Sequence, residues 1–408
     1  MDMEAQQYAT QVVKRLVNAG YIAYFAGGWV RDFLIGHPSD DIDIATNAPP
    51  EKILDLFPHT ILVGLAFGVI IVVIDGHQFE VATFRRDVEY VNGRKPTMIE
   101  LATPEEDASR RDFTINGMFY DPVEGVVHDF VQGAEDIQLG VIRTIGNPYD
   151  RFFEDRLRMV RGVRFAARFG FAMDEETHQA IRATAETLFP AVAMERIWQE
   201  LVKMSKYPHF DAAIIEMHRL ELLPVIFPTL KGVHLKEIRK RVAHFKDLPE
   251  KTETVLMLME LFPNIVHLEV LDLCRYLKIS IAEQKLAEFL VELRRLIAYD
   301  KQNGSWDKVI WAHVYAHKHF QICLSVISAG IPHEERMNFF DVHAKHQIEL
   351  KEHIQRIMQK RPLVNAALLQ TQGIVPGPAM GALLKEAEKI AILQDFNDPI
   401  KVLNILKY

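Results

Sequence analysis

The hydrophobic pattern of the chain changes near residue 147. Before that point, short runs rich in β-branched and aromatic residues alternate with turn residues, which is typical of strands. A helix is predicted over Ala5 to Asn18, because apolar residues recur there at helical spacing and Gly20 follows. Five later runs predict the strands of a small α/β unit with a mixed sheet: YIAYFA (21–26), DIDIAT (41–46), TILVGL (60–65), GVIIVVI (68–74) and HQFEVATF (77–84).

After Asn147 and Pro148 the apolar residues recur at helical spacing. The periodic runs include DRFFEDRLRMVRGVRFAARFGF (150–171), DEETHQAIRATAETLF (174–189), MERIWQELVKM (194–204), FDAAIIEMHRLELL (210–223) and PAMGALLKEAEKIAIL (378–393). The pattern therefore predicts an α+β protein, in which a small mixed-sheet head precedes a long all-helical part.

Composition narrows the class of protein. A chain of 408 residues exceeds one hydrophobic core, so two to four subdomains are expected. The net charge of −8 argues against a protein that coats nucleic acid nonspecifically. The two cysteines, Cys274 and Cys323, fit a reducing cytoplasmic setting. The longest apolar run, 67–74, is far shorter than the roughly 20 residues of a membrane span, and the N-terminal pattern is unlike a signal peptide, so neither is expected.

The first candidate chemistry lies at Asp41 and Asp43. Two side chains separated by one residue on a strand share a face, roughly 6 to 7 Å apart along the backbone. Ionised acids at that spacing repel each other unless a cation lies between them, and oxygen ligands suit magnesium. We therefore expect Asp41 and Asp43 to bind Mg²⁺ for a phosphoryl transfer. A solvated strand end is the simpler alternative.

A phosphate-binding turn is predicted directly before these acids. Gly27 and Gly28 lead into a predicted helix, WVRDFLIG, whose N-terminal amides favour an anion such as a triphosphate. Arg31 follows one turn later and can add a bidentate contact. The alternative is that the two glycines only make a turn.

Glu80 is a candidate third acid. It alternates with apolar residues in FEVATF, so it projects from one face of the sheet. There it could position metal ions or take a proton from a hydroxyl nucleophile. The alternative is a rim carboxylate paired with Arg85 or Arg86.

The run SRRDFTINGMFYD (109–121) places two arginines beside an acid. The guanidinium of Arg110 or Arg111 could bind phosphate or ribose oxygen, while Asp112 could accept a sugar hydroxyl. The alternative is a helix start with nothing bound, since Asp and Ser often cap helices.

The run EDRLRMVRGVRFAAR (154–168) is predicted as one helix, with Asp155, Arg158, Arg161 and Arg164 in one row at a spacing of three. Cytosine and adenine both present an exocyclic amine beside an unprotonated ring nitrogen, which suits a carboxylate beside a guanidinium. Guanine and uracil present a carbonyl and a ring N–H instead. Each mismatch costs about 1 to 3 kcal/mol in a closed pocket, so the row predicts selection of two bases. A basic solvated helix face is the alternative.

Together these motifs resemble the class II tRNA nucleotidyltransferase and bacterial poly(A) polymerase family. GGWVRDFLIG with DDIDIAT is similar to its metal motif, RRDFTINGM to its ribose motif, and EDRLR to its nucleotide-reading motif. MERIWQELVKM is similar to its helical neck motif, and PGPAMGALL to its tail. Three departures are Gly117 in place of the usual alanine, GLAFGVI in place of a His-Gly-Thr run, and Arg156 after the reading acid.

The resemblance implies a nucleotidyltransferase head (1–146), a neck with the nucleotide-reading helix (147–228), a body (229–330) and a tRNA-binding tail (331–408). It implies one pocket that takes CTP and ATP in turn, Mg²⁺ as cofactor, and a tRNA 3′ end as acceptor without a nucleic-acid template. The implied roles are metal binding for Asp41 and Asp43, triphosphate contacts for Gly28 and Arg31, ribose reading for Arg111 with Asp112, and base reading for Asp155 and Arg158 with support from Arg161 and Arg164.

Three activities of such a family compete, namely CCA addition, A-only addition beside a separate CC-adding partner, and poly(A) synthesis. The segment Arg85 to Asp107 is long enough for the mobile loop that is shortened, by resemblance, in relatives adding only cytidines. The chain also lacks the GRRFRL-like run and the basic C-terminal extension of the poly(A) polymerases. CCA addition therefore ranks first.

Two further classes remain open, a non-catalytic RNA-binding module and a nucleotidyltransferase that modifies small molecules. The intact acids argue against the first, and the long helical part argues against the second, because it suits a large acceptor. The basic runs 236–246 and 353–361 are expected to face tRNA phosphates, with affinity that falls steeply with salt. No membrane partner is expected, and the sequence predicts no particular oligomeric state.

Overall fold

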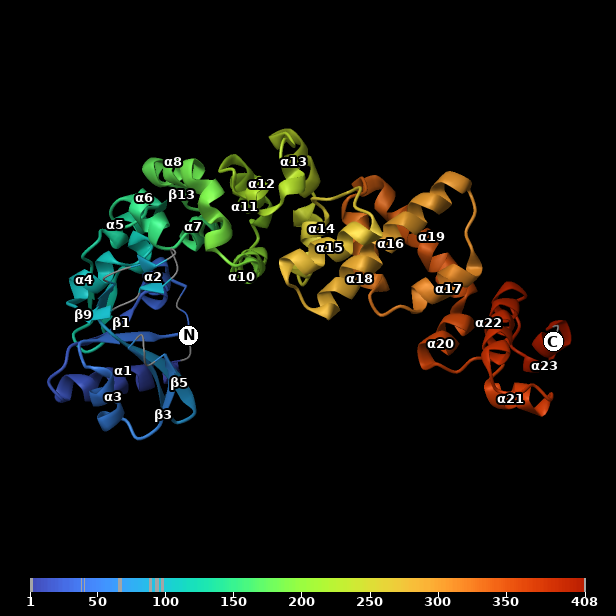
Figure 1. Ribbon diagram of the computed structural model, residues 1–408, viewed down its shortest axis with the longest axis horizontal. Helices are drawn as coiled ribbons and strands as arrows, with labels where there is room; N and C mark the ends of the chain where they lie inside the picture. Colours follow the sequence, from blue (N-terminus) through green and yellow to red (C-terminus); the bar gives the residue numbers. More distant parts are fainter. Residues whose placement is uncertain are drawn as a thin grey trace. The chain divides into compact units, whose positions relative to one another are not determined.

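The computed structural model describes residues 3–37, 39, 41–64, 68–87, 90–91, 95–96 and 99–406. The chain folds into two compact units, residues 1–240 and 241–408, coloured from blue through green and from yellow to red in Figure 1. Within the described residues, no helix is both long and apolar enough to cross a bilayer.

The head is built on a seven-stranded mixed sheet. Its strand order is β11 (Val126–His128), β10 (Phe119–Asp121), β1 (Ala23–Ala26), β2 (Asp43–Thr46), β5 (His77–Thr83), β4 (Val69–Ile74) and β3 (Thr60–Gly64). Strands β2 and β5 run parallel, whereas the other neighbouring pairs are antiparallel. The predicted mixed sheet and its five strands are therefore confirmed, with ends shifted by a few residues.

Three helices supply apolar faces to the head core: α1 (Met3–Asn18), α2 (Gly28–Ile35) and α3 (Pro50–Leu56). Leu16, Trp29 and Ile53 from these helices pack with Phe25 and Ile44 of the sheet, and all five are nearly fully buried. The core holds β1 and β2 rigidly at their adjoining ends, where the candidate acids and the glycine turn lie.

The segment 85–107 is more ordered than a long loop in its described parts. Strand β6 (Arg85–Asp87) pairs with β9 (Ile99–Leu101), β7 (Tyr90–Val91) pairs with β8 (Lys95–Pro96), and α4 (Pro104–Ser109) begins in a capping box made by Thr103 and Glu106. Residues 88–89, 92–94 and 97–98 of the expected loop lie outside the described residues. The further head elements are η2 (Thr114–Asn116), α5 (Gly133–Leu139) and β12 (Val141–Ile142).

The first unit continues as helices, with two corrections to the sequence prediction. The predicted single helix 154–168 is broken into α6 (Pro148–Glu154) and α7 (Leu157–Phe169). The break lies at Asp155, whose backbone is extended and whose carboxylate accepts the amide of Leu157 at 3.0 Å. An acid that bonds nearby amides competes with helix continuation, which explains the break. The second correction is β13 (Ala172–Met173), a short strand that pairs with β12 where only helices are predicted.

The remaining elements of the first unit are α8 (Glu175–Thr184), η3 (Ala185–Thr187), α9 (Leu188–Ala191), α10 (Met194–Ser205), α11 (Phe210–Arg219), α12 (Leu222–Ile226), η4 (Pro228–Leu230) and α13 (Leu235–Val242), which begins in it. Helices α10 and α11 both pack on α7.

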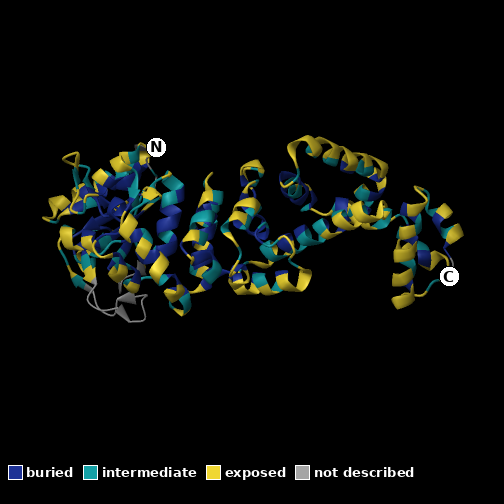
Figure 2. Ribbon diagram, turned by 90° about the horizontal axis from the view of Figure 1, so that it is seen from above, coloured by how far each residue is buried: buried dark blue, intermediate teal, exposed yellow. Residues whose placement is uncertain are grey.

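The second unit is helical throughout its described residues, as the pattern predicts. It contains η5 (Phe245–Asp247), α14 (Thr254–Met259), α15 (His267–Leu277), α16 (Ile281–Asn303), α17 (Lys308–Ala316), α18 (Phe320–Ala329), α19 (His333–Glu349), α20 (Lys351–Gln359), α21 (Ala366–Thr371), α22 (Pro378–Leu393) and α23 (Pro399–Ile405). Figure 2 shows buried residues on the inner faces of the helices of each unit and exposed residues outside. The expected boundaries at 147, 229 and 331 stay predictions.

His343 makes the second unit sensitive to acid. Its ring lies among Trp311 and Phe339, and the Tyr315 hydroxyl is 3.0 Å from its Nδ1. Burial, with a smaller effect from His346, lowers the pKa of His343 from 6.5 to about 4. As pH falls below 6.5 the unfolded chain binds a proton that the folded unit does not accept until about pH 4.

We therefore expect the second unit to lose on the order of 2 kcal/mol of stability through His343 alone between about pH 7 and about pH 5. His343→Phe should remove this part of the pH dependence, as measured by denaturant unfolding at both pH values. His333→Gln, at an exposed position on α19, is the matched control. An identical pH dependence in His343→Phe and the parent would contradict the assignment.

Candidate active site

A pocket of about 380 Å³ in the first unit gathers most of the residues singled out from the sequence. They come from the glycine turn and the first turn of α2, the start of β2, the segment from Arg110 through η2, the break before α7, α7 itself and α10. The lining residues are Gly27, Gly28, Arg31, Asp43, Arg110, Arg111, Asp112, Asn116, Asp155, Leu157, Arg158, Arg161, Phe165 and Arg196. Six arginines and three aspartates among them leave an excess of three positive charges, which suits a polyphosphate.

The glycine turn is fixed by a close approach of Arg111. Gly27 has φ of 62°, and a Cβ at this position would lie 2.8 Å from Nη1 of Arg111. A side chain here would be strained and would displace that guanidinium, so glycine is required. Arg111 itself is held by two contacts to Asp107, at 3.0 and 3.1 Å. Burial raises the pKa of Asp107, but the charges of Arg111 and Arg110 outweigh it and lower the pKa overall.

Arg31 is buried and pre-positioned, in contrast to a mobile surface arginine. It donates to Asp32 at 2.8 Å and to Oδ1 of Asn116 at 2.5 Å, and it stacks on Phe169 at 4.8 Å. Asp32 also accepts from Arg168 at 2.9 Å. Arg31 therefore adds positive charge beside the glycine turn through a fixed guanidinium.

The candidate metal acids meet where the start of β2 lies beside the middle of β5. Ile44 pairs with Val81, so the next position of the parallel register brings Asp43 beside Glu80. Asp43 is an exposed residue, yet partial desolvation of its carboxyl, followed by the charges of Asp41 and Glu80, raises its pKa to about 6. Asp41 precedes β2 and is exposed, whereas the prediction set both acids on the strand.

This donor set fits a hard divalent cation. A cation between Asp41 and Asp43 would relieve the repulsion that raises the Asp43 pKa. Magnesium needs only one or two protein carboxylates when substrate phosphates and water complete its shell. Among the described residues, no group of three or more acidic, histidine or cysteine side chains is arranged to hold a metal ion by itself. The alternative for Glu80 was an ion pair with Arg85 or Arg86. Of these two described residues, Arg86 forms its ion pair with Glu100, at 2.5 Å, and not with Glu80.

Asp112 is engaged on both carboxylate oxygens. Oδ1 accepts from the Phe113 amide and from Asn116, each at 2.9 Å, and Oδ2 accepts from Arg161 at 2.6 and 2.7 Å. Burial raises the pKa of Asp112, but the Arg161 ion pair, the Asn116 hydrogen bond and the charge of Arg158 together lower it well below its usual range. Asp112 thus fixes the orientation of Arg161 in the pocket.

Asp155 and Arg158 line the pocket, but each is paired with a residue that sequence reasoning missed. Asp155 contacts Arg196 of α10 at 2.8 Å, and Arg158 contacts Glu154 of α6 at 2.5 Å. Arg158 also donates to the carbonyl oxygen of Arg110 at 3.1 Å. The two residues are not on one helix face, because Asp155 lies in the break between α6 and α7.

Arg164 is the one arginine of the predicted row that does not line the pocket, among the described residues. It points to α10, where Nε lies 2.5 Å from Oε2 of the buried Glu200. Arg164 therefore affects the pocket only indirectly, because its ion pair with Glu200 joins α7 to α10.

Comparison with known families identifies two domains in the first unit. Residues 23–143 match the family described as the poly A polymerase head domain, and residues 170–232 match the family described as a probable RNA and SrmB-binding site of polymerase A. The CCA-adding enzyme of Bacillus cereus (strain Q1) is 44% identical over 221 residues, which are 54% of this chain and 55% of that protein. Residues 23–143 of this chain are therefore a poly A polymerase head domain.

Further relatives give the same picture. The Bacillus anthracis CCA-adding enzyme (strain A0248) is 44% identical over 203 residues, 50% of this chain and 51% of its own. The chain thus spans about half the length of the curated relatives that it matches. The solved Bacillus stearothermophilus CCA-adding enzyme, in complex with CTP, has a TM-score of 0.79 at 26% identity and covers 99% of this chain and 98% of its own. The Thermotoga maritima enzyme complexed with tRNA has the same fold, with a TM-score of 0.70 at 20% identity over 100% and 97%.

Two of the departures from the nucleotidyltransferase pattern have local causes. At Gly117 a Cβ would lie 2.7 Å from Cγ2 of Val131 and 3.0 Å from Cδ1 of Ile145, so this chain has no room for the usual alanine. Arg156 donates to the carbonyl oxygen of Phe153 at 2.5 Å and does not line the described part of the pocket. In the GLAFGVI run, residues 65–67 lie outside the described residues.

Proposed function

We propose that this protein adds the 3′-terminal CCA to tRNA from CTP and ATP without a nucleic-acid template. The observation that carries the proposal is one pocket in which an excess of positive charge, the acid Asp43 and the pair Asp155 and Arg158 occur together. The likeness to the Bacillus stearothermophilus enzyme in complex with CTP, over nearly the whole of both chains, supports the same substrate class.

We assign the transfer chemistry to the Asp43 side of the pocket. Nucleotidyltransferases of this family generally use a divalent metal, and we propose Mg²⁺ at Asp41 and Asp43. When bound, such an ion would stabilise charge on the transferring phosphoryl group. Arg31, Arg111 and the amides at the start of α2 would bind the triphosphate. Glu80 would take the proton of the tRNA 3′ hydroxyl as it attacks the α-phosphorus and diphosphate leaves.

The opposite side of the pocket would choose the base. Asp155 would accept from the exocyclic amine of cytosine or adenine, and Arg158 would donate to the neighbouring ring nitrogen. Arg196 and Glu154 would hold these two side chains in position, since they contact them in the structure. Arg111 and Asp112 would read the ribose, with Asp112 acting through Arg161 because its oxygens are already engaged.

The deciding experiment is incorporation into tRNA transcripts that end at the discriminator base, at C or at CC, with one nucleotide supplied at a time. CCA addition predicts CTP incorporation on the first two transcripts and a single A on the third. Incorporation of A alone would establish the A-adding alternative, and long A tails would establish poly(A) synthesis.

The base-reading assignment predicts a specific change in selectivity. In Asp155→Asn, the amide can donate to the O4 carbonyl of uracil, which relieves one of the two mismatches. We therefore expect the ratio of UTP to CTP incorporation to rise about tenfold or more, since one mismatched pair is worth about 1 to 3 kcal/mol. The measurement is single-turnover incorporation with each nucleotide. Asp150→Asn, at an exposed position of α6, should leave the ratio unchanged. An unaltered ratio in Asp155→Asn itself would refute the assignment.

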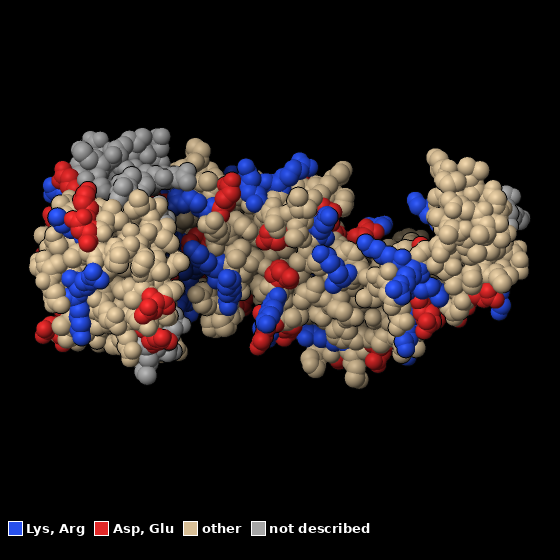
Figure 3. Space-filling model, turned by 90° about the horizontal axis from the view of Figure 1, so that it is seen from below, with Lys and Arg blue, Asp and Glu red and all other residues tan. Residues whose placement is uncertain are grey.

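The tRNA backbone would meet the basic residues of the helices. Figure 3 shows Lys and Arg in separate clusters interrupted by acids on the face that it draws. In the run 353–361, His353 is buried and Arg356 contacts Asn397 at 2.7 Å, so these two are engaged within the protein. We assign the tRNA-facing role to exposed residues such as Lys236, Lys240 and Lys360.

The thiols of both cysteines are buried and free, which supports a cytoplasmic, reducing compartment.

A further inference from the structure

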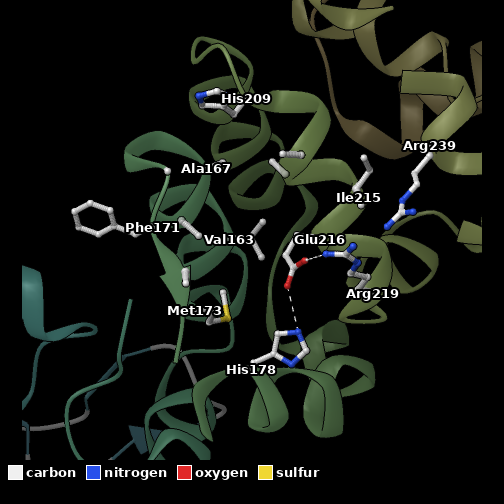
Figure 4. Close-up of a pocket in the computed structure, with 15 residues that line it drawn as sticks. Val163, Ala167, Phe171, Met173, His178, His209, Ile215, Glu216, Arg219 and Arg239 are labelled. Atoms are coloured by element: carbon white, nitrogen blue, oxygen red, sulfur yellow. Dashed lines mark hydrogen bonds and ion pairs between the residues drawn. The ribbon is translucent and has the colours of Figure 1, made fainter. Parts of the chain in front are cut away.

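A second cavity, here called the rear cavity, lies on the side of α7 away from the nucleotide pocket. It has a volume of about 640 Å³, is open to solvent, and is lined by residues of α7, β13, α8, α11 and α13 and of the segments that join them (Figure 4). None of the 15 described residues that line it also lines the nucleotide pocket. The family match does not say which of its residues contact RNA, and the proposed transfer reaction does not use this cavity.

The walls of the rear cavity are apolar and made largely of small side chains. Val163 and Ala167 of α7, Ala213 of α11 and Met173 of β13 are among the lining residues. The volume falls in the range of about 300 to 1,000 Å³ of sites that bury small ligands.

A charged cluster lies at the mouth of the rear cavity. Glu216 is central in Figure 4, with Nε2 of His178 at 3.2 Å and Nη1 of Arg219 at 3.1 Å. Arg239 of α13 points to the same side and forms no ion pair with any residue that the structure describes. Two guanidinium groups face one carboxylate, so the mouth attracts an anion.

We propose that the rear cavity binds a nucleoside monophosphate unit, with the base between the apolar walls and the phosphate on Arg219 and Arg239. A nucleotide matches all three parts of the cavity, because the base also offers donors and acceptors to Glu216 and His178. A fatty acid would leave that polar edge unmatched, which disfavours it. Eleven of the lining residues, from Gly170 to Arg219, fall within the match at 170–232, which favours a nucleotide of an RNA chain as the source.

The proposal rests on the proposed function only in taking RNA as a ligand of this protein. A free mononucleotide has the same chemistry as a nucleotide of an RNA chain, so the experiment needs both forms. Saturating CTP keeps the nucleotide pocket filled while the rear cavity is probed.

The test is photo-crosslinking of the full chain with 8-azidoadenosine 5′-monophosphate, and with a short single-stranded oligoribonucleotide that carries one such base. Crosslinked peptides are then mapped by mass spectrometry. We expect labels within 163–173 or 209–219.

Arg239→Ala should lower the labelling about tenfold, as expected for loss of a charge-assisted phosphate contact. Ala212→Trp, which fills the cavity from an exposed rim position, should abolish the labelling. Arg182→Ala, an exposed arginine of α8 outside the cavity, is the matched control and should not change it.

Each outcome decides one point. Labelling by the free nucleotide assigns the cavity to mononucleotides, and labelling by the oligonucleotide alone assigns it to RNA. Labels found only outside residues 163–173 and 209–219 overturn the proposal, and so do labels that persist in Ala212→Trp. This holds whether or not the same region also binds a protein. Incorporation into tRNA is measured on the same preparations. If incorporation continues without these labels, the rear-cavity proposal fails alone, and if incorporation is absent while the labels appear, only the proposed function fails.

Discussion

Asp43→Asn is expected to lower nucleotide incorporation about 10³-fold while leaving the fold intact. The metal-binding and charge-stabilising role proposed for this carboxylate is worth several kcal/mol, and each 1.36 kcal/mol corresponds to a factor of ten in rate. Stability should change little, because Asp43 is an exposed residue at the end of β2 and its charge is repelled by Asp41 and Glu80. Removing that repulsion can even stabilise the head slightly.

The measurement is single-turnover incorporation of CTP into tRNA, with thermal unfolding followed in parallel. Asp55→Asn is the matched control, because Asp55 is an exposed acid of α3 in the same head, 3.1 Å from Lys52. It should retain parental activity. Full incorporation by Asp43→Asn would sink the catalytic proposal and would favour a non-catalytic RNA-binding module.

Glu200→Ala is expected to destabilise the first unit by about 3 to 5 kcal/mol, the usual cost of leaving one charge of a buried ion pair without its partner. Arg164 and Glu200 join α7 to α10, and their side chains are only 8% and 4% exposed. Lys203 lies 3.6 Å from the other oxygen of Glu200, but it is exposed and cannot replace the lost carboxylate. The reading arginines on α7 should lose their fixed position together with the stability.

Denaturant unfolding of the first unit measures this effect. Lys203→Ala should cost little, because it removes only the exposed partner. The double variant Arg164→Met with Glu200→Leu should recover most of the loss, since apolar residues of similar size can replace a buried pair. A cost well under 1 kcal/mol in Glu200→Ala would show that Arg164 finds water or another acceptor, contrary to its burial in the structure.

The local pattern of the sequence was enough to predict the strands of the sheet and the short motifs that hold most of the pocket residues. Gly28, Arg31, Asp43 and Asp112 lie in such motifs, but their meeting in one pocket is long-range and was expected only from the family resemblance. The helical character of the remainder also follows from periodicity. These features depend on neighbours within a few residues.

The partners of the pocket residues could not be predicted in the same way. Arg196 is 41 residues from Asp155, and Glu200 is 36 residues from Arg164. Many acids and arginines in this chain could make such pairs, and only the packing of α10 on α7 selects these two. The available signal was a basic and an acidic residue four apart in MERIWQELVKM, which places them on one helix face.

The break at Asp155 was missed for a different reason. Apolar periodicity continues through it, because α6 and α7 both bury residues such as Phe152 and Val160. Helical spacing therefore predicts one helix across residues 154–168. The competing preference of the Asp155 side chain for the Leu157 amide is a local effect that periodicity does not record.

The two halves of the proposed base reader differ in stiffness as a consequence of that break. The backbone of Arg158 belongs to the regular helix α7, whereas Asp155 is an extended residue in the break between α6 and α7. The Asp155 carboxylate depends instead on two separate elements, the Leu157 amide at the start of α7 and Arg196 of α10. In the proposed reader, a difference in width between a one-ring and a two-ring base would therefore be taken up on the Asp155 side, where α10 meets the break, and not on the helix that carries the guanidinium.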